Sequence, residues 1–161
     1  MNWGHLFFKF DGRVNRAKFW IAALIFAAIN VVLAILGYVT DQSVVFQALN
    51  SMLGIVILIS SIAVGVKRLH DRNKSGWYLL LFYLVPSILV VIGVLIGAFM
   101  EDSTIIATVL GLLALAIGVW AFVEMGCLRG TIGVNQYGPD PVAPATSVTT
   151  PTTVAQTPVP F

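Results

Sequence analysis

Residues 67–77, with the sequence KRLHDRNKSGW, hold the densest group of side chains that could bind charged partners. Clustered Lys and Arg beside an apolar run bind phosphate groups, most simply phospholipid headgroups, and a histidine adds a pH-sensitive hydrogen bond. The alternative interpretation is an anchor that fixes membrane orientation, in which His70 and Asp71 satisfy nearby backbone groups. The candidate binding residues here and before the first apolar run are Arg13, Arg16, Lys18, Lys67, Arg68, His70, Asp71, Arg72, Lys74 and Trp77.

The same segment does not have the pattern of a catalytic site. Adjacent His70 and Asp71 cannot form a dyad on a helix, because neighbouring side chains point apart. If the preceding helix continues, Lys67 and Asp71 stand four residues apart and can pair. No catalytic nucleophile or set of metal ligands accompanies them, so we expect no catalytic residue, no metal, no cofactor and no enzymatic activity. Cys127 is the one cysteine, and we expect a free thiol.

The basic residues fall in three groups separated by two long intervals without Lys or Arg. Four precede the first apolar run, four lie in residues 67–74, and Arg129 follows the last run. Each interval is long enough for two spans of about 20 residues and a turn. Because basic residues remain on the cytoplasmic side of a membrane, this distribution places both termini and the central loop in the cytoplasm. The turns between the paired spans carry acidic residues, namely Asp41, Glu101 and Asp102.

Composition supports an integral membrane protein. Hydrophobic residues make up 58% and charged residues 10% of the 161 residues, and the mean hydropathy is +0.94, whereas a soluble domain has about 25% charged residues. The sequence therefore predicts an all-α membrane protein with four transmembrane helices arranged as two hairpins, at about residues 19–39, 44–66, 77–99 and 105–125. The net charge of +2 is too small to indicate a nucleic-acid partner.

Four regions follow from these patterns. Residues 1–18 are expected to form an interfacial segment, either lying on the membrane surface or packing its aromatic rings on the helices. Residues 19–128 form the transmembrane domain, with Asn15 as the N-cap of its first helix. Residues 129–141 form a cytoplasmic turn motif. Residues 142–161, rich in Thr and Pro, cannot bury a core and are expected to be disordered.

Within the predicted spans, small residues indicate helix contacts and a few polar residues suggest an alternative function. Gly93 and Gly97 form a GxxxG pair, and Ala and Gly form a stripe within residues 107–118. This pattern predicts close packing of the third and fourth spans.

Glu124 and Asn30 are the candidate transport residues, because carboxylates at membrane depth are often functional. Pro86 is expected to kink the third span.

Three separated motifs resemble a known bacterial family. They are residues 12–20 (GRVNRAKFW), residues 68–71 (RLHD) with 74–77 (KSGW), and residues 135–141 (NQYGPDP). Together they resemble the YhaH-like inner-membrane proteins, catalogued as domain of unknown function 805. The resemblance spans residues 6–141 and implies a multi-span bacterial inner-membrane protein, but it supplies no activity. The chain departs from the family pattern at Lys18, Lys67 and the Arg72–Asn73 pair.

The turn motif gives a further structural hypothesis. Gly138 and the prolines enforce turns, and Asn135 and Asp140 suit turn-forming side-chain bonds. We expect this segment, with candidate residues Asn135, Tyr137, Gly138, Pro139 and Asp140, to fold back onto the basic loop. Asp140 would then pair with one of four arginines: Arg13, Arg16, Arg68 or Arg72.

The leading functional hypothesis is a non-enzymatic protein of the bacterial inner membrane. Its basic cytoplasmic face would bind anionic lipid headgroups or a protein partner, either a second copy of the chain or another membrane protein. A small transporter or channel subunit is the second hypothesis. A lipid-modifying enzyme that uses His70 and Asp71 is the third.

Overall fold

The computed structural model is all-helical, as the sequence predicts, and describes residues 3–41, 43–100 and 104–143. Four helices are long and apolar enough to cross a membrane. The elements in chain order are α1 (Trp3–Phe8), α2 (Arg16–Val39), α3 (Val44–Asp71), α4 (Tyr78–Phe99), α5 (Thr104–Phe122) and the π-helical turn η1 (Val123–Cys127). The proposed acidic turn at Glu101 and Asp102 lies outside the described residues, as do residues 144–161 of the proposed disordered tail (residues 142–161).

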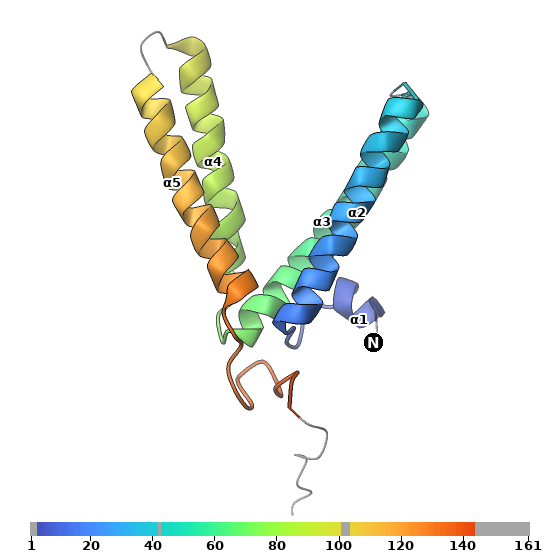
Figure 1. Ribbon diagram of the computed structural model, residues 1–161, viewed down its shortest axis with the longest axis vertical. Helices are drawn as coiled ribbons and strands as arrows, with labels where there is room; N and C mark the ends of the chain where they lie inside the picture. The colour runs from blue at the N-terminus through green and yellow to red at the C-terminus, as the bar shows by residue number, and fades with distance from the viewer. Residues whose placement is uncertain (1–2, 42, 101–103, 144–161) are drawn as a thin grey trace, which may run out of the picture.

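The helices form two pairs that diverge from one end of the molecule. Figure 1 shows α2 beside α3 and α4 beside α5, with the pairs meeting where α1, the 67–77 loop and η1 lie. Two small cores occupy this junction. One joins α3, α4, α5 and η1 through residues that include Leu69, Phe82 and Met125. The other joins α1, α2 and α3 through residues that include Leu6 and Val64. The rest of each helix exposes an apolar surface, which suits contact with lipid.

Local sequence signals explain where α2 begins and where α3 ends. Asn15 accepts a hydrogen bond from the backbone N–H of Lys18 at 2.9 Å, so the predicted N-cap of α2 is confirmed. Helix α3 continues five residues beyond the predicted end at residue 66, through the basic motif to Asp71. Asn73 then adopts a left-handed conformation with φ +57°. This residue ends the helix in the way that Gly or Asn ends many helices.

The small residues contribute unequally to helix packing. Gly93 of α4 lies against α5, because a Cβ there would meet the backbone of Ala107. A Cβ at Gly97, Gly111 or Gly118 would meet no described atom within 4 Å. The prediction of close packing between the third and fourth spans is therefore confirmed at Gly93, but the GxxxG register does not extend to Gly97. Helix α4 remains helical through Pro86.

The N-terminal segment packs on the helices, as one of the two interpretations of its sequence expects. Leu6 is buried in the junction, and the ring of Phe7 packs on Phe26 of α2. Trp3, Phe8 and Phe10 remain exposed at 47%, 58% and 44%. One face of α1 thus packs on the helices and the other presents aromatic rings, as in interfacial segments.

Candidate functional site

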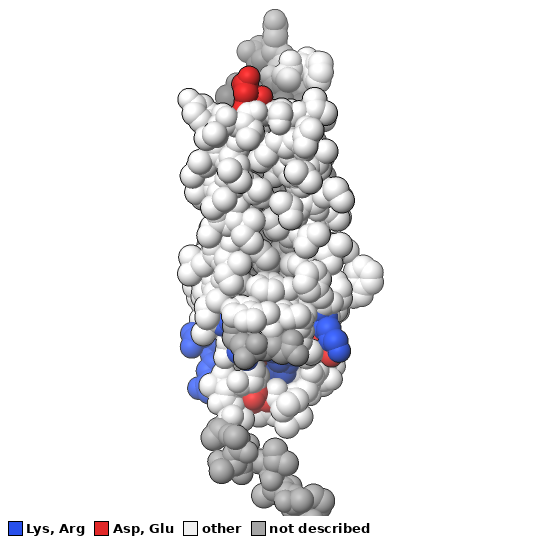
Figure 2. Space-filling model, turned by 90° about the vertical axis from the view of Figure 1, so that its right-hand side faces the viewer, with Lys and Arg blue, Asp and Glu red and all other residues white. Residues whose placement is uncertain are grey.

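The three motif segments meet at the junction of the helix pairs. Together with residues 124–134, which lead to the third motif, they form one structure, which we call the cap (residues 12–20, 67–77 and 124–141). Figure 2 shows Lys and Arg gathered at this end of the molecule, and none along the helices on the face in view. The sequence hypothesis that the third motif folds onto the basic loop agrees with this arrangement. The backbone N–H of Thr131 donates to the Asp71 carbonyl at 2.8 Å, and the Asn135 side chain donates to the His70 carbonyl at 2.9 Å.

At the centre of the cap, one carboxylate binds two guanidinium groups. Asp71 Oδ2 accepts from Arg68 Nη1 at 2.6 Å, and Asp71 Oδ1 lies 3.0 Å from Arg13 Nη2. The side chains of Arg68, Arg13 and Asp71 are only 0%, 1% and 3% exposed. A buried charge is tolerated only when it is paired and its remaining polar atoms are satisfied. This ion triad therefore has to be assembled whenever the cap is folded.

Backbone carbonyls of the C-terminal segment satisfy the remaining guanidinium donors. Arg68 donates to the carbonyls of Met125 and Leu128. Arg13 donates to the carbonyls of Thr131, Gly133 and Gly138. The two arginines consequently fix the path of the chain from η1 to the turn motif, although they lie far away in sequence.

Lys67 holds the N-terminal helix. Its ammonium group donates to the carbonyls of His5 and Leu6 near the end of α1, and the residue is 1% exposed. Carbonyls in the last turn of a helix have no partner within the helix, and a cation there also complements the helix dipole. The expected pair between Lys67 and Asp71 does not form, because Asp71 binds Arg68 one turn away and Arg13 instead.

Glu124 forms a second ion cluster at the edge of the cap. Its Oε1 lies 3.0 Å from Arg72 Nε and 3.1 Å from Lys74 Nζ. Arg72 also donates to the carbonyl of Arg129. Asn30, the other candidate transport residue, lies in α2 and donates back to the Phe26 carbonyl.

The turn motif is fixed by its own hydrogen bonds and by a ring contact. The His70 and Tyr137 rings stack with centroids 3.7 Å apart and an interplanar angle of 4°. Asn135 and Gly138 bond each other's backbone in both directions, and Gly138 has φ +129°, which favours glycine. His70 Nδ1 lies 3.3 Å from the Gly12 carbonyl, so this histidine contacts both other motifs.

Asp140 has a local role instead of the ion pair expected from sequence. Its carboxylate accepts from the backbone N–H groups of Val142 at 2.9 Å and Gly133 at 3.2 Å. These bonds, the Val142 bond first, and the nearby charges of Arg13 and Arg129 hold the pKa of Asp140 below its ordinary value. Asp71 is the carboxylate that Arg13 and Arg68 bind, so the expected partnership of Asp140 with these arginines is wrong.

Two of the remaining basic residues line a polar cavity of about 300 Å³. Arg16 and Arg129 line this cavity and are exposed, as is Lys9 nearby in sequence, while Lys18 is half-buried. Arg16 Nη1 donates to the Cys127 carbonyl at 2.9 Å. The two carboxylates that also line the cavity, Asp71 and Asp140, are bound by arginines and backbone N–H groups respectively. The carboxylates that line the cavity are therefore already engaged within the cap.

The predicted binding residues of the cap differ widely in how far they are buried. Lys67, Arg68, Asp71 and the Arg13 side chain are internal, Arg72, Lys74 and His70 are partly exposed, and Trp77 is 77% exposed. Sequence reasoning missed Gly130 and Thr131, which contact Asp71 directly. Their only signal was a position just after the last span. Within residues 3–41, 43–100 and 104–143, no group of His, Cys, Asp and Glu could hold a metal ion.

Comparisons with known proteins agree with the membrane architecture. The family described as "Protein of unknown function (DUF805)" matches residues 7–139. The Inner membrane protein YhaH of Escherichia coli (strain K12) is 28% identical over 138 residues, covering 82% of this chain and 86% of the relative. The Inner membrane protein YhaI of the same strain is 26% identical, covering 82% and 85%. The Uncharacterized protein YiiR is 31% identical, covering 83% and 86%. No solved structure matches significantly.

Proposed function

We infer the function from the cap, because the chain belongs to the DUF805 family, which is described only as being of unknown function. The chain is a multi-pass inner-membrane protein with four helices able to span the bilayer. Its function is to hold two membrane hairpins together at the cytoplasmic face and to bind anionic phospholipid headgroups there. Both termini are cytoplasmic in this proposal. The activity is binding without catalysis.

The observation that carries this proposal is the division of the basic residues into internal and external sets. The internal set comprises Arg13, Lys67 and Arg68, whose side chains bind other groups of the protein and hold the cap together. The external set comprises the exposed Lys9, Arg16 and Arg129 and the half-buried Lys18. Figure 2 shows Lys and Arg gathered at one end of the molecule. Near an anionic leaflet each exposed cation contributes about 1 kcal/mol. Three exposed cations together with the half-buried Lys18 are therefore enough for a clear preference for anionic lipid.

The contacts of the candidate residues favour binding over the alternatives. Asp71 is saturated by two arginines, and the His70 ring is stacked on Tyr137, so the two do not face a common substrate. Glu124 is bound by Arg72 and Lys74 within the cap. Asn30 lies in α2, away from the cap, so the two transport candidates do not lie together.

Neutralising the external cations is expected to abolish the preference for anionic lipid. The variant carries Lys9→Gln, Arg16→Gln, Lys18→Gln and Arg129→Gln, and the matched control exchanges Lys and Arg at the same positions. Each full-length protein is reconstituted with equal phosphatidylglycerol and phosphatidylcholine, and native mass spectrometry measures the ratio of the two lipids retained. Wild type and control should retain mainly phosphatidylglycerol, and the neutralised variant should retain both equally. Equal ratios in all three proteins would overturn the proposal.

A further inference from the structure

Two cavities between α3 and α4 join into one groove that runs from the cap into the membrane-spanning region. The first, of about 310 Å³, is lined by Ser61 of α3 and by Tyr83 and Ser87 of α4. The second, of about 430 Å³, reaches His70 and Tyr137 in the cap. Three residues line both cavities: Ile62, Leu79 and Leu80. We call the joined cavities the α3–α4 groove.

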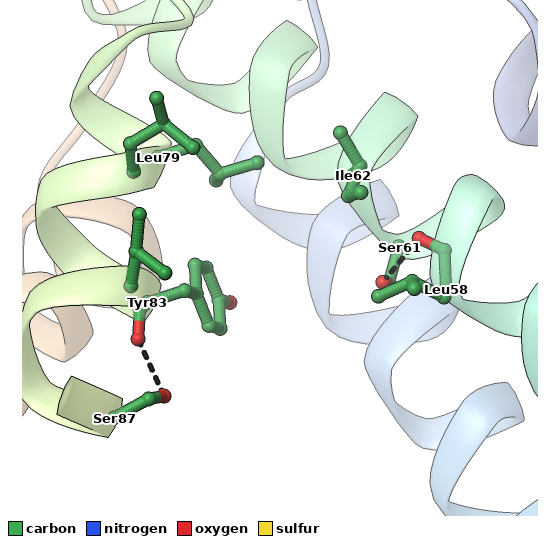
Figure 3. A pocket seen from close by; sticks show the side chains of 8 residues that line it. Leu58, Ser61, Ile62, Leu79, Tyr83 and Ser87 are labelled. Carbon is green, nitrogen blue, oxygen red and sulfur yellow. Dashed lines mark hydrogen bonds between the residues drawn. The ribbon is translucent and has the colours of Figure 1, made fainter.

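The membrane half of the groove has an apolar lining, and its two serine hydroxyls are bound within their own helices. Figure 3 shows Leu58, Ser61 and Ile62 on α3 across from Leu79 and Tyr83 on α4. The two serine hydroxyls are already used, because Ser61 donates to the Leu58 carbonyl at 2.8 Å and Ser87 to the Tyr83 carbonyl at 2.7 Å. Such bonds remove the donor that would otherwise be costly in hydrocarbon. This half therefore offers packing to an apolar chain.

The cap half of the groove is more polar than the membrane half, and two cationic residues lie next to it in the sequence. The hydroxyl of Ser75, the imidazole of His70 and the ring of Trp77 line it. His70 Nδ1 is engaged by the Gly12 carbonyl, so Nε2 is the ring nitrogen left for a further partner. The cationic side chains that precede Ser75, Arg72 and Lys74, remain 24% and 29% exposed although they bind Glu124. Trp77 is exposed, as expected of an aromatic residue at a membrane interface.

We propose that the α3–α4 groove is a binding site for one phospholipid of the cytoplasmic leaflet. One acyl chain lies between α3 and α4, and the phosphate lies at the His70, Ser75 and Trp77 end. The groove becomes more polar toward the cap, which matches an amphiphile with its headgroup at that end. The partly exposed Arg72 and Lys74, which shortly precede Ser75 and share one carboxylate, give this region a net positive charge. This inference rests on the proposed function for its orientation, but it concerns a defined site distinct from the external cations.

A second copy of the chain fits the groove less well. A helix from another copy would supply an apolar surface to the membrane half. It would offer little to the polar half, because the acids at this end of the chain already have partners. Asp71 and Glu124 are bound by its own arginines and lysine, Asp140 by backbone N–H groups, and Asp11 lies 3.7 Å from His5. Lipid supplies both an apolar chain and an unbound anion.

Filling the groove is expected to remove a retained phospholipid. Ser61→Trp and Ser87→Trp each place an indole in the membrane half. Ser51→Trp and Thr108→Trp are matched controls, because these hydroxyls also donate to a backbone carbonyl one turn earlier and lie outside the groove. Full-length proteins from phosphatidylglycerol and phosphatidylcholine vesicles are stripped stepwise in the mass spectrometer. Wild type and controls should keep one phospholipid after the others are lost, and both groove variants should lose it.

A measurement on the wild-type protein tests the same site without relying on the folding of the variants. A phosphatidylglycerol with a photoreactive group in the middle of its acyl chain is cross-linked in vesicles, and the modified peptides are mapped. Adducts should concentrate at residues 58–62 and 79–87. Adducts spread evenly over all four helices, or a groove variant that keeps the last phospholipid, would overturn the proposal. So would a dimer that only Ser61→Trp and Ser87→Trp dissociate, since a second copy would then be the occupant.

The two proposals fail in different ways. Groove filling is expected to change the number of tightly held lipids while leaving the headgroup ratio of the remainder unchanged. Neutralising the external cations is expected to change that ratio and leave the tightly held molecule in place. A lost ratio with a retained groove lipid, or the reverse, therefore shows which of the two is wrong.

Discussion

Asp71→Asn is expected to destabilise the protein by about 3–5 kcal/mol, the cost typical of breaking a buried ion pair by removing one partner. The substitution preserves shape, so no cavity forms and the loss is electrostatic. It leaves the buried guanidinium groups of Arg13 and Arg68 without an anion. Reversible unfolding of the purified protein in a mild detergent, followed by the fluorescence of its four tryptophans, measures the change.

Asp140→Asn is the matched control for this prediction. It is the same chemical change within the cap, but the Asp140 carboxylate is not paired with the buried arginines. It accepts one backbone N–H on each oxygen, and an asparagine oxygen can keep one of these two bonds. Its effect should be much smaller than that of Asp71→Asn. In a double-mutant cycle, Arg13→Gln should cost less in the Asp71→Asn background than in wild type, because the two residues interact. Equal losses for the two Asp variants would show that the ion triad does not hold the cap.

Gly130→Ala is expected to have the next largest effect, because no space exists for a Cβ at this position. An ideal Cβ would fall closer than 3.0 Å to the carboxyl atoms of Asp71. Asp71 cannot move aside without leaving its two arginines. We expect a loss of at least about 1–3 kcal/mol, the usual cost of overpacking, and partial release of the turn motif from α3. The Gly130 backbone does not have a positive φ, so the effect is one of space alone.

Hydrogen exchange locates this effect. The amides of Thr131 and Asn135 bond Asp71 and Gly138 in wild type, so they should exchange faster in Gly130→Ala. Gly97→Ala is the control, because a Cβ there meets no described atom within 4 Å and alanine favours the helix. If Gly130→Ala protects these amides as well as wild type does, the close contact with Asp71 is wrong.

The sequence was sufficient for the spans because their signals are local. Runs of apolar residues predict four membrane helices, and Asn15 predicts the start of the first. The meeting of the three motifs could be expected as well, since the charge distribution places them on one side. A GxxxG spacing was less informative, because an apolar helix gives little indication of which face meets its neighbour. Gly93 contacts α5, whereas Gly97 does not.

The pairing within the cap depends on tertiary contacts that spacing does not encode. Lys67 and Asp71 have the spacing of a helical ion pair, yet Asp71 binds Arg68 and a residue 58 positions away, Arg13. Cations beside a membrane span are also ordinarily expected at the headgroups. Here Lys67 and Arg68 are buried because backbone carbonyls from α1 and from residues 125–128 satisfy them. Those carbonyls carry no sequence signal.

The central claim is that the cap lies in the cytoplasm, and single-cysteine labelling tests it most directly. Cys127 is the one cysteine of the chain and lies exposed at the cap. In a Cys127→Ser background, Lys9→Cys places a thiol at the basic end and Thr40→Cys places one at the α2–α3 turn. A membrane-impermeant maleimide should label Thr40→Cys in spheroplasts and Lys9→Cys only in inverted vesicles. Labelling of Lys9→Cys in intact spheroplasts would contradict the account.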